Sequence, residues 1–198
     1  MQVNRSVSPD ERILAAADKL FYSHGIRAVG VDAVALEAGV SKRTLYAYYP
    51  SKDHLIAAYL TARFKLPPPS DAPAREQLLG YFDRLEKLFA DGSFRGCPFV
   101  NAVTEIGDPK HPAATIAVRF KDERRAWYRA LLDRLGVADA AGLAVQLQML
   151  ADGAIATMLV RNDPRVARAA RAAAEVLLDA AQAGKKSAAR RSRRAARH

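Results

Sequence analysis

Residues 31–52, VDAVALEAGVSKRTLYAYYPSK, constrain the fold of this chain more than any other segment. Apolar residues recur at helical spacing in its first half, and Gly39 then supplies a tight turn of the kind that joins packed helices. Ser41 is a good N-cap for a second short helix, in which Leu45 can pack against Val40 as a hydrophobic staple. The segment therefore predicts a helix-turn-helix.

The outward face of the second helix indicates what this motif binds. At about 100° per residue, Leu45 and Tyr49 share the buried face. The opposite face and its flanks carry small and hydrogen-bonding side chains: Lys42, Arg43, Thr44, Tyr46 and Ala47. Such groups fit the major groove of DNA, where an Arg can bind guanine through two hydrogen bonds. We interpret this face as a DNA-reading surface; the alternative is a solvated face on a short core helix.

At these residues the chain resembles the tetracycline-repressor (TetR) family of bacterial transcription regulators. The matching residues stand at the family's spacing: Ala38-Gly39-Val40-Ser41, Thr44-Leu45-Tyr46, Tyr49, and Ser51-Lys52-Asp53 with Leu55. The resemblance extends upstream, where Ser8 and Glu11 can form a capping box with Pro9 at the first helical position. That first helix stops at Gly25, as it does in the family.

The resemblance implies an all-α fold of about nine helices. A three-helix helix-turn-helix DNA-binding domain with its connecting helix would occupy residues 1–66. An α-helical ligand-binding and dimerisation domain would follow at residues 67–183, and a basic disordered tail at residues 184–198.

The resemblance also assigns roles to residues of the helix-turn-helix. Lys42, Arg43 and Thr44 would face DNA bases. Four residues would hold phosphates: Ser41, Tyr46, Tyr48 and Lys52. Two positions depart from the family pattern. Gly30 lacks the hydroxyl that usually caps the second helix, and Tyr49 replaces the usual Phe, so its hydroxyl needs a partner.

The rest of the chain has helical periodicity and no strand signal. A proline-rich boundary at residues 67–73 separates its two halves. Helices are expected at about residues 51–64, 74–90, 99–106, 112–135, 140–160 and 164–183, the last ending before Gly184. The inner stripe expected for the 112–135 helix consists of Ile116, Phe120, Trp127, Leu131 and Leu135.

The last two helices indicate how the protein assembles. The helix at 140–160 is apolar on two sides, and the alanines of the final helix permit close approach of another helix. Both helices could belong to the core of one monomer, or they could meet their copies in a four-helix interface. The resemblance favours the homodimer. The residues expected at its interface are Leu143, Leu147, Leu150, Ala154, Met158, Val166, Ala170, Ala173 and Leu177.

The function that the resemblance implies is that of a homodimeric repressor of transcription. It would bind a palindromic operator in double-stranded DNA and be released by a small-molecule effector with unequal affinity for two conformers. The sequence does not identify the effector. The candidates for its pocket are polar and aromatic residues of the middle helices: Tyr81, Asn101, Thr104, Glu105, Trp127, Gln148 and Asp152.

Two alternative functions stay open at this point. Cys97, which precedes a helix and has Arg95 nearby, could make the protein a redox- or electrophile-responsive regulator, or it could be an inert small hydrophobe. The basic tail offers the second alternative. Seven of the 31 basic residues and none of the 21 acidic ones lie in residues 184–198. Such a tail could drive largely non-specific DNA binding through phosphates, or it could simply be solvated.

Composition and spacing argue against other classes of protein. The single cysteine allows no disulfide within one chain and fits a reducing cytoplasm. No apolar run approaches the roughly 20 residues that span a bilayer, so neither a membrane protein nor an exported one is expected. The four histidines lack metal-ligand spacing, and no nucleophile motif or phosphate-binding glycine loop occurs. We therefore expect no enzyme, metal or cofactor.

Overall fold

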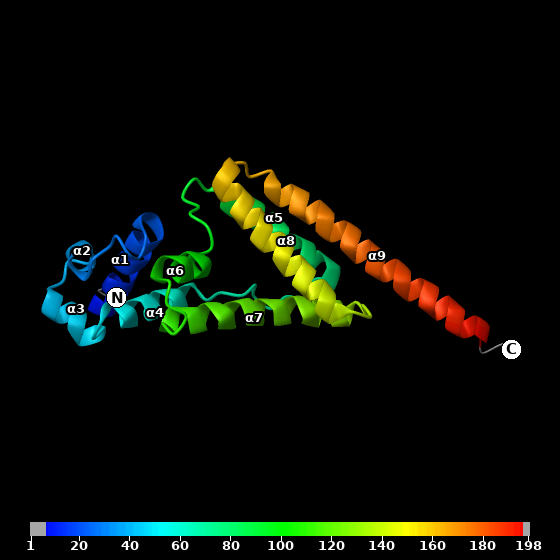
Figure 1. Ribbon diagram of the computed structural model, residues 1–198, viewed down its shortest axis with the longest axis horizontal. Helices are drawn as coiled ribbons and strands as arrows, with labels where there is room; N and C mark the ends of the chain where they lie inside the picture. Colours follow the sequence, from blue (N-terminus) through cyan, green and yellow to red (C-terminus); the bar gives the residue numbers. More distant parts are fainter. Residues whose placement is uncertain (1–6, 196–198) are drawn as a thin grey trace, which may run out of the picture. The chain divides into compact units, whose positions relative to one another are not determined.

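The computed structural model describes the backbone of residues 7–195 and the side chains of residues 7–183. This part of the chain is all-α, as expected, and its helices are shown in Figure 1. They are α1 (Pro9–His24), α2 (Val31–Glu37), α3 (Lys42–Tyr48), α4 (Lys52–Arg63), α5 (Ala74–Ala90), α6 (Pro98–Ile106), α7 (Pro112–Arg134), α8 (Ala140–Arg161) and α9 (Val166–Ala195).

The helices pack into two compact units. The first contains the chain up to Lys65 together with Cys97–Phe120, and the second contains Leu66–Gly96 together with the chain from Lys121 onward. The break at residue 65 lies next to the expected domain boundary. Residues 97–120, however, pack with the first unit, whereas the sequence analysis assigns them to the second domain.

The first unit is built around α1, which contacts α2, α3 and α4. Its start is the expected capping box, in which the Ser8 hydroxyl accepts from the Glu11 backbone and the Glu11 carboxylate accepts from the Ser8 backbone. The core residues Ile13, Leu45 and Leu55 are completely buried. These contacts fix three short helices that could not hold their shape alone.

Aromatic rings and one carboxylate bind residues 97–120 to this unit. Phe99 stacks on Phe120 with ring centroids 4.0 Å apart, and Phe64 meets both rings edge-on. On α6, the Glu105 carboxylate accepts a hydrogen bond of 3.0 Å from the backbone of Arg27. Sequence periodicity does not show contacts between such distant segments. The sequence analysis therefore placed α6 in the second domain, with its neighbours in the chain.

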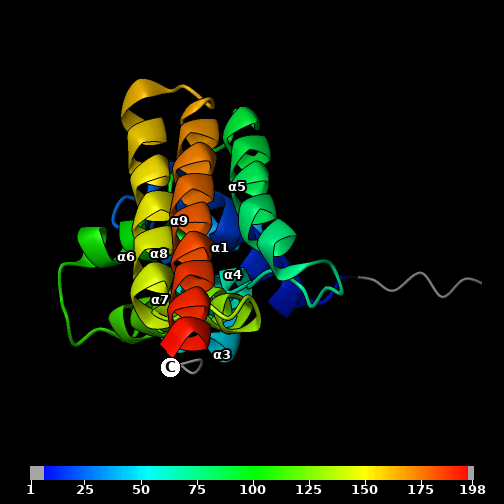
Figure 2. The ribbon, with the colours of Figure 1, turned by 90° about the vertical axis from the view of Figure 1, so that its right-hand side faces the viewer.

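In the second unit, α9 lies between α8 and α5 (Figure 2). Phe82, Leu147 and Leu178 are completely buried in its core. Arg171 of α9 also forms an ion pair of 2.9 Å with Asp83 of α5. The α9 helix thus holds the unit together through both apolar and ionic contacts.

The α8 helix is long and apolar enough to cross a membrane by length and composition, although the sequence analysis expects no such segment. Its most apolar 18-residue window has a mean hydropathy of 1.5. One side packs Leu143 and Leu147 into the core, and Asp152 forms ion pairs with Lys121 and Arg124. These contacts describe a core helix whose second side is also apolar.

The ends of α9 differ from expectation. Pro164 and Arg165 form a turn, so the helix begins at Val166, and its backbone continues through Gly184 to Ala195. The sequence analysis expects disorder from residue 184. Alanine, lysine and arginine are strong helix formers and no proline follows, so local propensity extends the helix already begun in the core.

Gly25 gives the first prediction. Its φ of +90° and ψ of 150° suit glycine almost exclusively, and an added Cβ would lie 2.9 Å from Oε2 of Glu105. We expect Gly25→Ala to lower the free energy of unfolding by about 1–3 kcal/mol. Gly80→Ala, in open space within α5, is the control and should raise it by about 0.5–1 kcal/mol. Urea unfolding monitored by circular dichroism measures the free energy of unfolding of both variants. Equal effects would show that the backbone at Gly25 does not require glycine.

Candidate nucleic-acid interface

Three contacts fix the orientation of α3. The Ser41 hydroxyl caps the helix by accepting a hydrogen bond of 3.0 Å from the Thr44 backbone. Leu45 is completely buried. The Tyr49 hydroxyl donates to Asp10 at 2.6 Å, and burial together with this bond raises the pKa of Tyr49. The partner that the sequence analysis requires for Tyr49 is therefore Asp10.

With its inner side fixed, α3 presents a polar face to solvent. Lys42, Arg43 and Ala47 are exposed, and Tyr46 and Tyr48 are 40% and 46% exposed. Thr44 is half-buried, and its hydroxyl lies 2.8 Å from that of Ser41. The face therefore combines two cations, two phenols and a small residue that allows close backbone approach.

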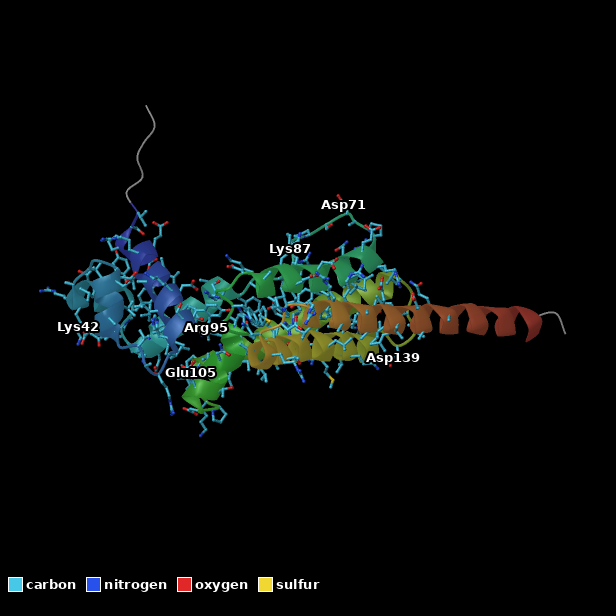
Figure 3. All side chains as sticks on the ribbon, turned by 90° about the horizontal axis from the view of Figure 1, so that it is seen from above. Lys42, Asp71, Lys87, Arg95, Glu105 and Asp139 are labelled. Atoms are coloured by element: carbon cyan, nitrogen blue, oxygen red, sulfur yellow. The ribbon has the colours of Figure 1, made fainter. Side chains whose placement is uncertain are left out.

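One of these cations already has an anionic partner. Lys42, which Figure 3 shows on α3, forms an ion pair of 2.8 Å with Asp32 in the first turn of α2. The hydrogen bond and charge of Asp32 raise the pKa of Lys42. A Lys42 that contacts DNA must leave this carboxylate or share it.

The start of α4 provides a second anion-attracting feature next to α3. Ser51 caps this helix by accepting from the His54 backbone, and Lys52 is its first residue. Backbone amides and a lysine at a helix N-terminus favour phosphate. At α2, Gly30 gives no side-chain cap, as its departure from the family pattern implies.

Comparisons with known proteins agree with this geometry. Residues 13–59 match the family described as "Bacterial regulatory proteins, tetR family". The chain is 35% identical to a TetR-type regulator of Streptomyces avermitilis whose structure is known, over 85% of this chain and 98% of that one, with a TM-score of 0.74. It is 31% identical to a TetR-family transcriptional regulator of Streptomyces coelicolor, over 88% and 96% of the two chains, with a TM-score of 0.80.

The chain belongs to the TetR family. It is also 28% identical to the HTH-type transcriptional regulator YjdC of Escherichia coli, over 84% of this chain and 92% of that protein. The protein is thus a helix-turn-helix transcriptional regulator that binds DNA, and not an enzyme. The polar face of α3 is the surface of this TetR-family protein that is suited to read DNA.

A buried polar cluster occupies the second unit. Arg124, only 2% exposed, donates to the Tyr81 hydroxyl at 3.0 Å and to Asp152 at 2.5 Å. Lys121 reaches the same Asp152 oxygen at 2.6 Å. Burial opposes the charge of Arg124, but Tyr81 and Asp152 outweigh it and raise its pKa.

Tyr128 completes this cluster. Its hydroxyl is buried without a hydrogen-bond partner among the side chains described, and burial raises its pKa. Tyr81 contributes to that shift, although the two hydroxyls do not meet in hydrogen-bond geometry. Gln148 has a buried amide oxygen that is likewise without a partner. Buried polar atoms of this kind require an explanation, because native proteins satisfy nearly all of them.

The residues proposed for the effector pocket are divided between the units. Four lie in the second unit: Tyr81 and Asp152, which belong to the buried polar cluster, together with Trp127 and Gln148. Three lie on α6 in the first unit: Asn101, Thr104 and Glu105. Glu105, labelled in Figure 3, binds the backbone of Arg27, and Thr104 is exposed. Cys97, the thiol of the alternative function, is buried at the N-cap of α6.

Sequence reasoning missed Lys121, Arg124 and Tyr128. Their spacing of three and seven residues places them on one face of α7, but the inner stripe of this helix was predicted from its apolar residues and Trp127 alone. Phe120 and Leu131 of the expected stripe are buried, whereas Ile116, Trp127 and Leu135 are only half-buried, and Arg124 and Tyr128 are buried in addition. A helical projection of α7 that included its polar residues would have placed Arg124 and Tyr128 on the same face as Leu131.

The side chains described in the second unit border hollows at its surface. One, of about 400 Å³, is bordered by the proline-rich segment before α5, by residues of α5 and by Trp127. Another is an apolar groove of about 710 Å³ between α8 and α9. This α8/α9 groove is lined by Gln146, Met149, Leu150, Gly153, Ala154, Thr157, Val166, Ala169, Ala170, Ala173 and Leu177.

Six of the nine residues proposed for the dimer interface line the α8/α9 groove: Leu150, Ala154, Val166, Ala170, Ala173 and Leu177. The other three, Leu143, Leu147 and Met158, do not line the groove and are buried in the core of their own unit. The exposed side of α8 is formed instead by residues such as Met149, which is 67% exposed.

The ion pair between Lys42 and Asp32 gives the second prediction. Asp32→Asn removes a carboxylate beside α3 and releases Lys42, so we expect a several-fold rise in affinity for operator DNA. This rise should be smaller at high salt, where charges are screened. Glu37→Gln is the matched control, because Glu37 pairs with Lys19 on α1 rather than with α3. Fluorescence anisotropy with labelled DNA measures both variants. Equal effects of the two substitutions would show that only net charge matters.

Proposed function

We propose that this TetR-family regulator is a homodimeric repressor that binds a palindromic operator in the cytoplasm and is released by a small-molecule effector. The observation that carries the proposal is the polar face of α3, whose orientation is fixed by Ser41, Leu45 and Tyr49. A fixed helix with an outward Arg and a small residue at its centre is suited to the major groove.

We assign the side chains of this face the roles that the family resemblance implies. Lys42, Arg43 and Thr44, in the first turn of α3, contact base edges. Four residues contact phosphates: Ser41, Tyr46, Tyr48 and Lys52. The Ser41 hydroxyl accepts from the Thr44 backbone and lies 2.8 Å from the Thr44 hydroxyl, so its proton is available to a phosphate when Thr44 is the donor between the two hydroxyls.

The α8/α9 groove supports the homodimer. It is apolar and includes the exposed Met149, and the unit exposes further large apolar side chains on the same two helices: Val145, Leu159, Val160 and Val176. Patches of this kind mark association sites. A second copy brings an identical groove, and two copies related by a twofold axis bury both in a four-helix contact.

The buried polar cluster supports a small-molecule effector. A ligand that binds one conformer of the second unit more tightly shifts the population toward that conformer, and the shift is limited by the difference in affinity. Repression ends when the favoured conformer no longer presents its two α3 helices at the spacing of the half-sites.

DNA reading is tested by selecting bound duplexes from a random pool at near-physiological salt, with the chain truncated after Ala183. We expect an enriched palindrome, and Arg43→Ala should weaken its binding by about tenfold to a hundredfold. Arg129→Ala, which removes an exposed guanidinium of the second unit, is the control. If nothing is enriched and only the full-length chain binds, DNA binding is non-specific and resides in the basic tail.

Assembly is tested by placing a charge in the α8/α9 groove. Met149→Glu should halve the mass measured by light scattering and weaken operator binding, because two half-sites are then bound independently. Leu88→Glu, at an exposed apolar position of α5 outside the groove, should leave a dimer. A monomeric unaltered protein, or a dimer that tolerates Met149→Glu, would contradict the proposed interface.

A further inference from the structure

The hollow beside Trp127 has the size of a small-molecule site. Its volume is about 400 Å³, within the range of ligand pockets. It is lined by Pro67, Pro68, Pro69, Ser70, Ala72, Glu76, Gln77, Arg84 and Trp127. We refer to it as the Trp127 pocket.

The rim of the Trp127 pocket is held in place. The Gln77 amide donates to the backbone oxygens of Ser70 at 2.9 Å and of Ala72 at 2.6 Å. The three prolines before Ser70 restrict the backbone further. The segment therefore forms a preformed wall, which reduces the entropy lost when a ligand binds.

Two lining residues indicate the chemistry of the ligand. Trp127 offers a half-buried aromatic surface. Arg84 is exposed and makes no hydrogen bond or ion pair among the residues described; its guanidinium lies 5.9 Å from the centre of the Tyr81 ring. A planar guanidinium with available donors matches a carboxylate through two parallel hydrogen bonds.

A cationic ligand fits this place less well. The Tyr81 ring already has two guanidiniums about 6 Å from its centre, those of Arg84 and Arg124. The acidic lining residue, Glu76, stands eight residues from Arg84 on α5, about 12 Å along the helix. A third cation beside these guanidiniums would be repelled, whereas an anion gains from Arg84, the arginine that lines the pocket.

We propose that the Trp127 pocket binds a small aromatic carboxylate, with its ring against Trp127 and its carboxylate on Arg84. This inference rests on the proposed function, because it names the chemical class of the effector. It also explains how binding is sensed. Trp127 packs against Tyr81 and Tyr128, and Tyr81 hydrogen-bonds to Arg124, which pairs with Asp152 on α8.

The test uses the full-length protein and four probes: benzoate, benzamide, benzylamine and acetate. Trp127 is the only tryptophan of the chain, so its emission reports the pocket directly. We expect a saturable change with benzoate and an affinity at least about tenfold weaker for neutral benzamide, which lacks the charge-assisted contact. Benzylamine and acetate should bind more weakly than benzamide, so the Trp127 emission should not saturate with either at concentrations that saturate it with benzamide.

Variants identify the contact. Arg84→Gln should lower benzoate affinity by about tenfold or more and leave benzamide affinity unchanged. Lys87→Gln removes the same charge from the same helix outside the pocket and should change neither; Figure 3 labels this residue. Equal affinities for benzoate and benzamide, undiminished benzoate binding in Arg84→Gln, or preference for benzylamine would each overturn the assignment.

Operator binding by the same samples separates the two proposals. If the ligand-free protein binds no operator, the proposed repressor function fails. If it binds operator but Trp127 shows no saturable response to benzoate, the present inference alone fails. Benzoate that binds at Arg84 and lowers operator affinity supports both, whereas benzoate that binds without changing operator affinity overturns its assignment as an effector.

Discussion

A helix of seven residues is too short to keep its shape in water, and α3 is such a helix. Its conformation therefore depends on contacts outside it. The burial of Leu45 and the hydrogen bond from Tyr49 to Asp10 fix it to α1, and the Ser41 cap defines its first turn. Because these groups occupy the inner side of α3, the core contacts determine which of its side chains point outward and can meet DNA.

The second unit is constrained by the burial of Arg124. A buried guanidinium loses its hydration, so it is retained only where close partners offset that loss, and Tyr81 and Asp152 do so here. Asp152 lies on α8, the helix that is apolar enough to span a membrane, and its ion pair with Arg124 fixes this helix to α7 in the core. The cluster thus fixes the facing sides of α5, α7 and α8, while Tyr128 keeps a polar group unsatisfied among them.

Local sequence signals predicted most of the fold. The limits of α5 follow from prolines before it and Asp91-Gly92 after it, and the α1 capping box follows from Ser8 and Glu11. The exposed face of α3 was likewise predictable, because caps and periodicity are local. The docking of α6 on the first unit was not, since it depends on contacts of Glu105 with residues nearly eighty positions away. Arg124 was missed because the side chains that hydrogen-bond to it and offset its lost hydration, Tyr81 and Asp152, lie on other helices.

The division of the chain into units bears on how a signal from the proposed effector would reach DNA. The chain passes between the units after Lys65, after Gly96 and after Phe120, and the last passage lies inside the continuous helix α7. Lys121 and Arg124 stand directly after it and contact α8, which lines the proposed dimer groove. The ligand proposed for the Trp127 pocket would therefore act one helical turn from Arg124, on a helix whose first nine residues belong to the first unit. Coupling by this route requires two packings of the polar cluster with different ligand affinities, and the buried Tyr128 hydroxyl is the group that a second packing would satisfy.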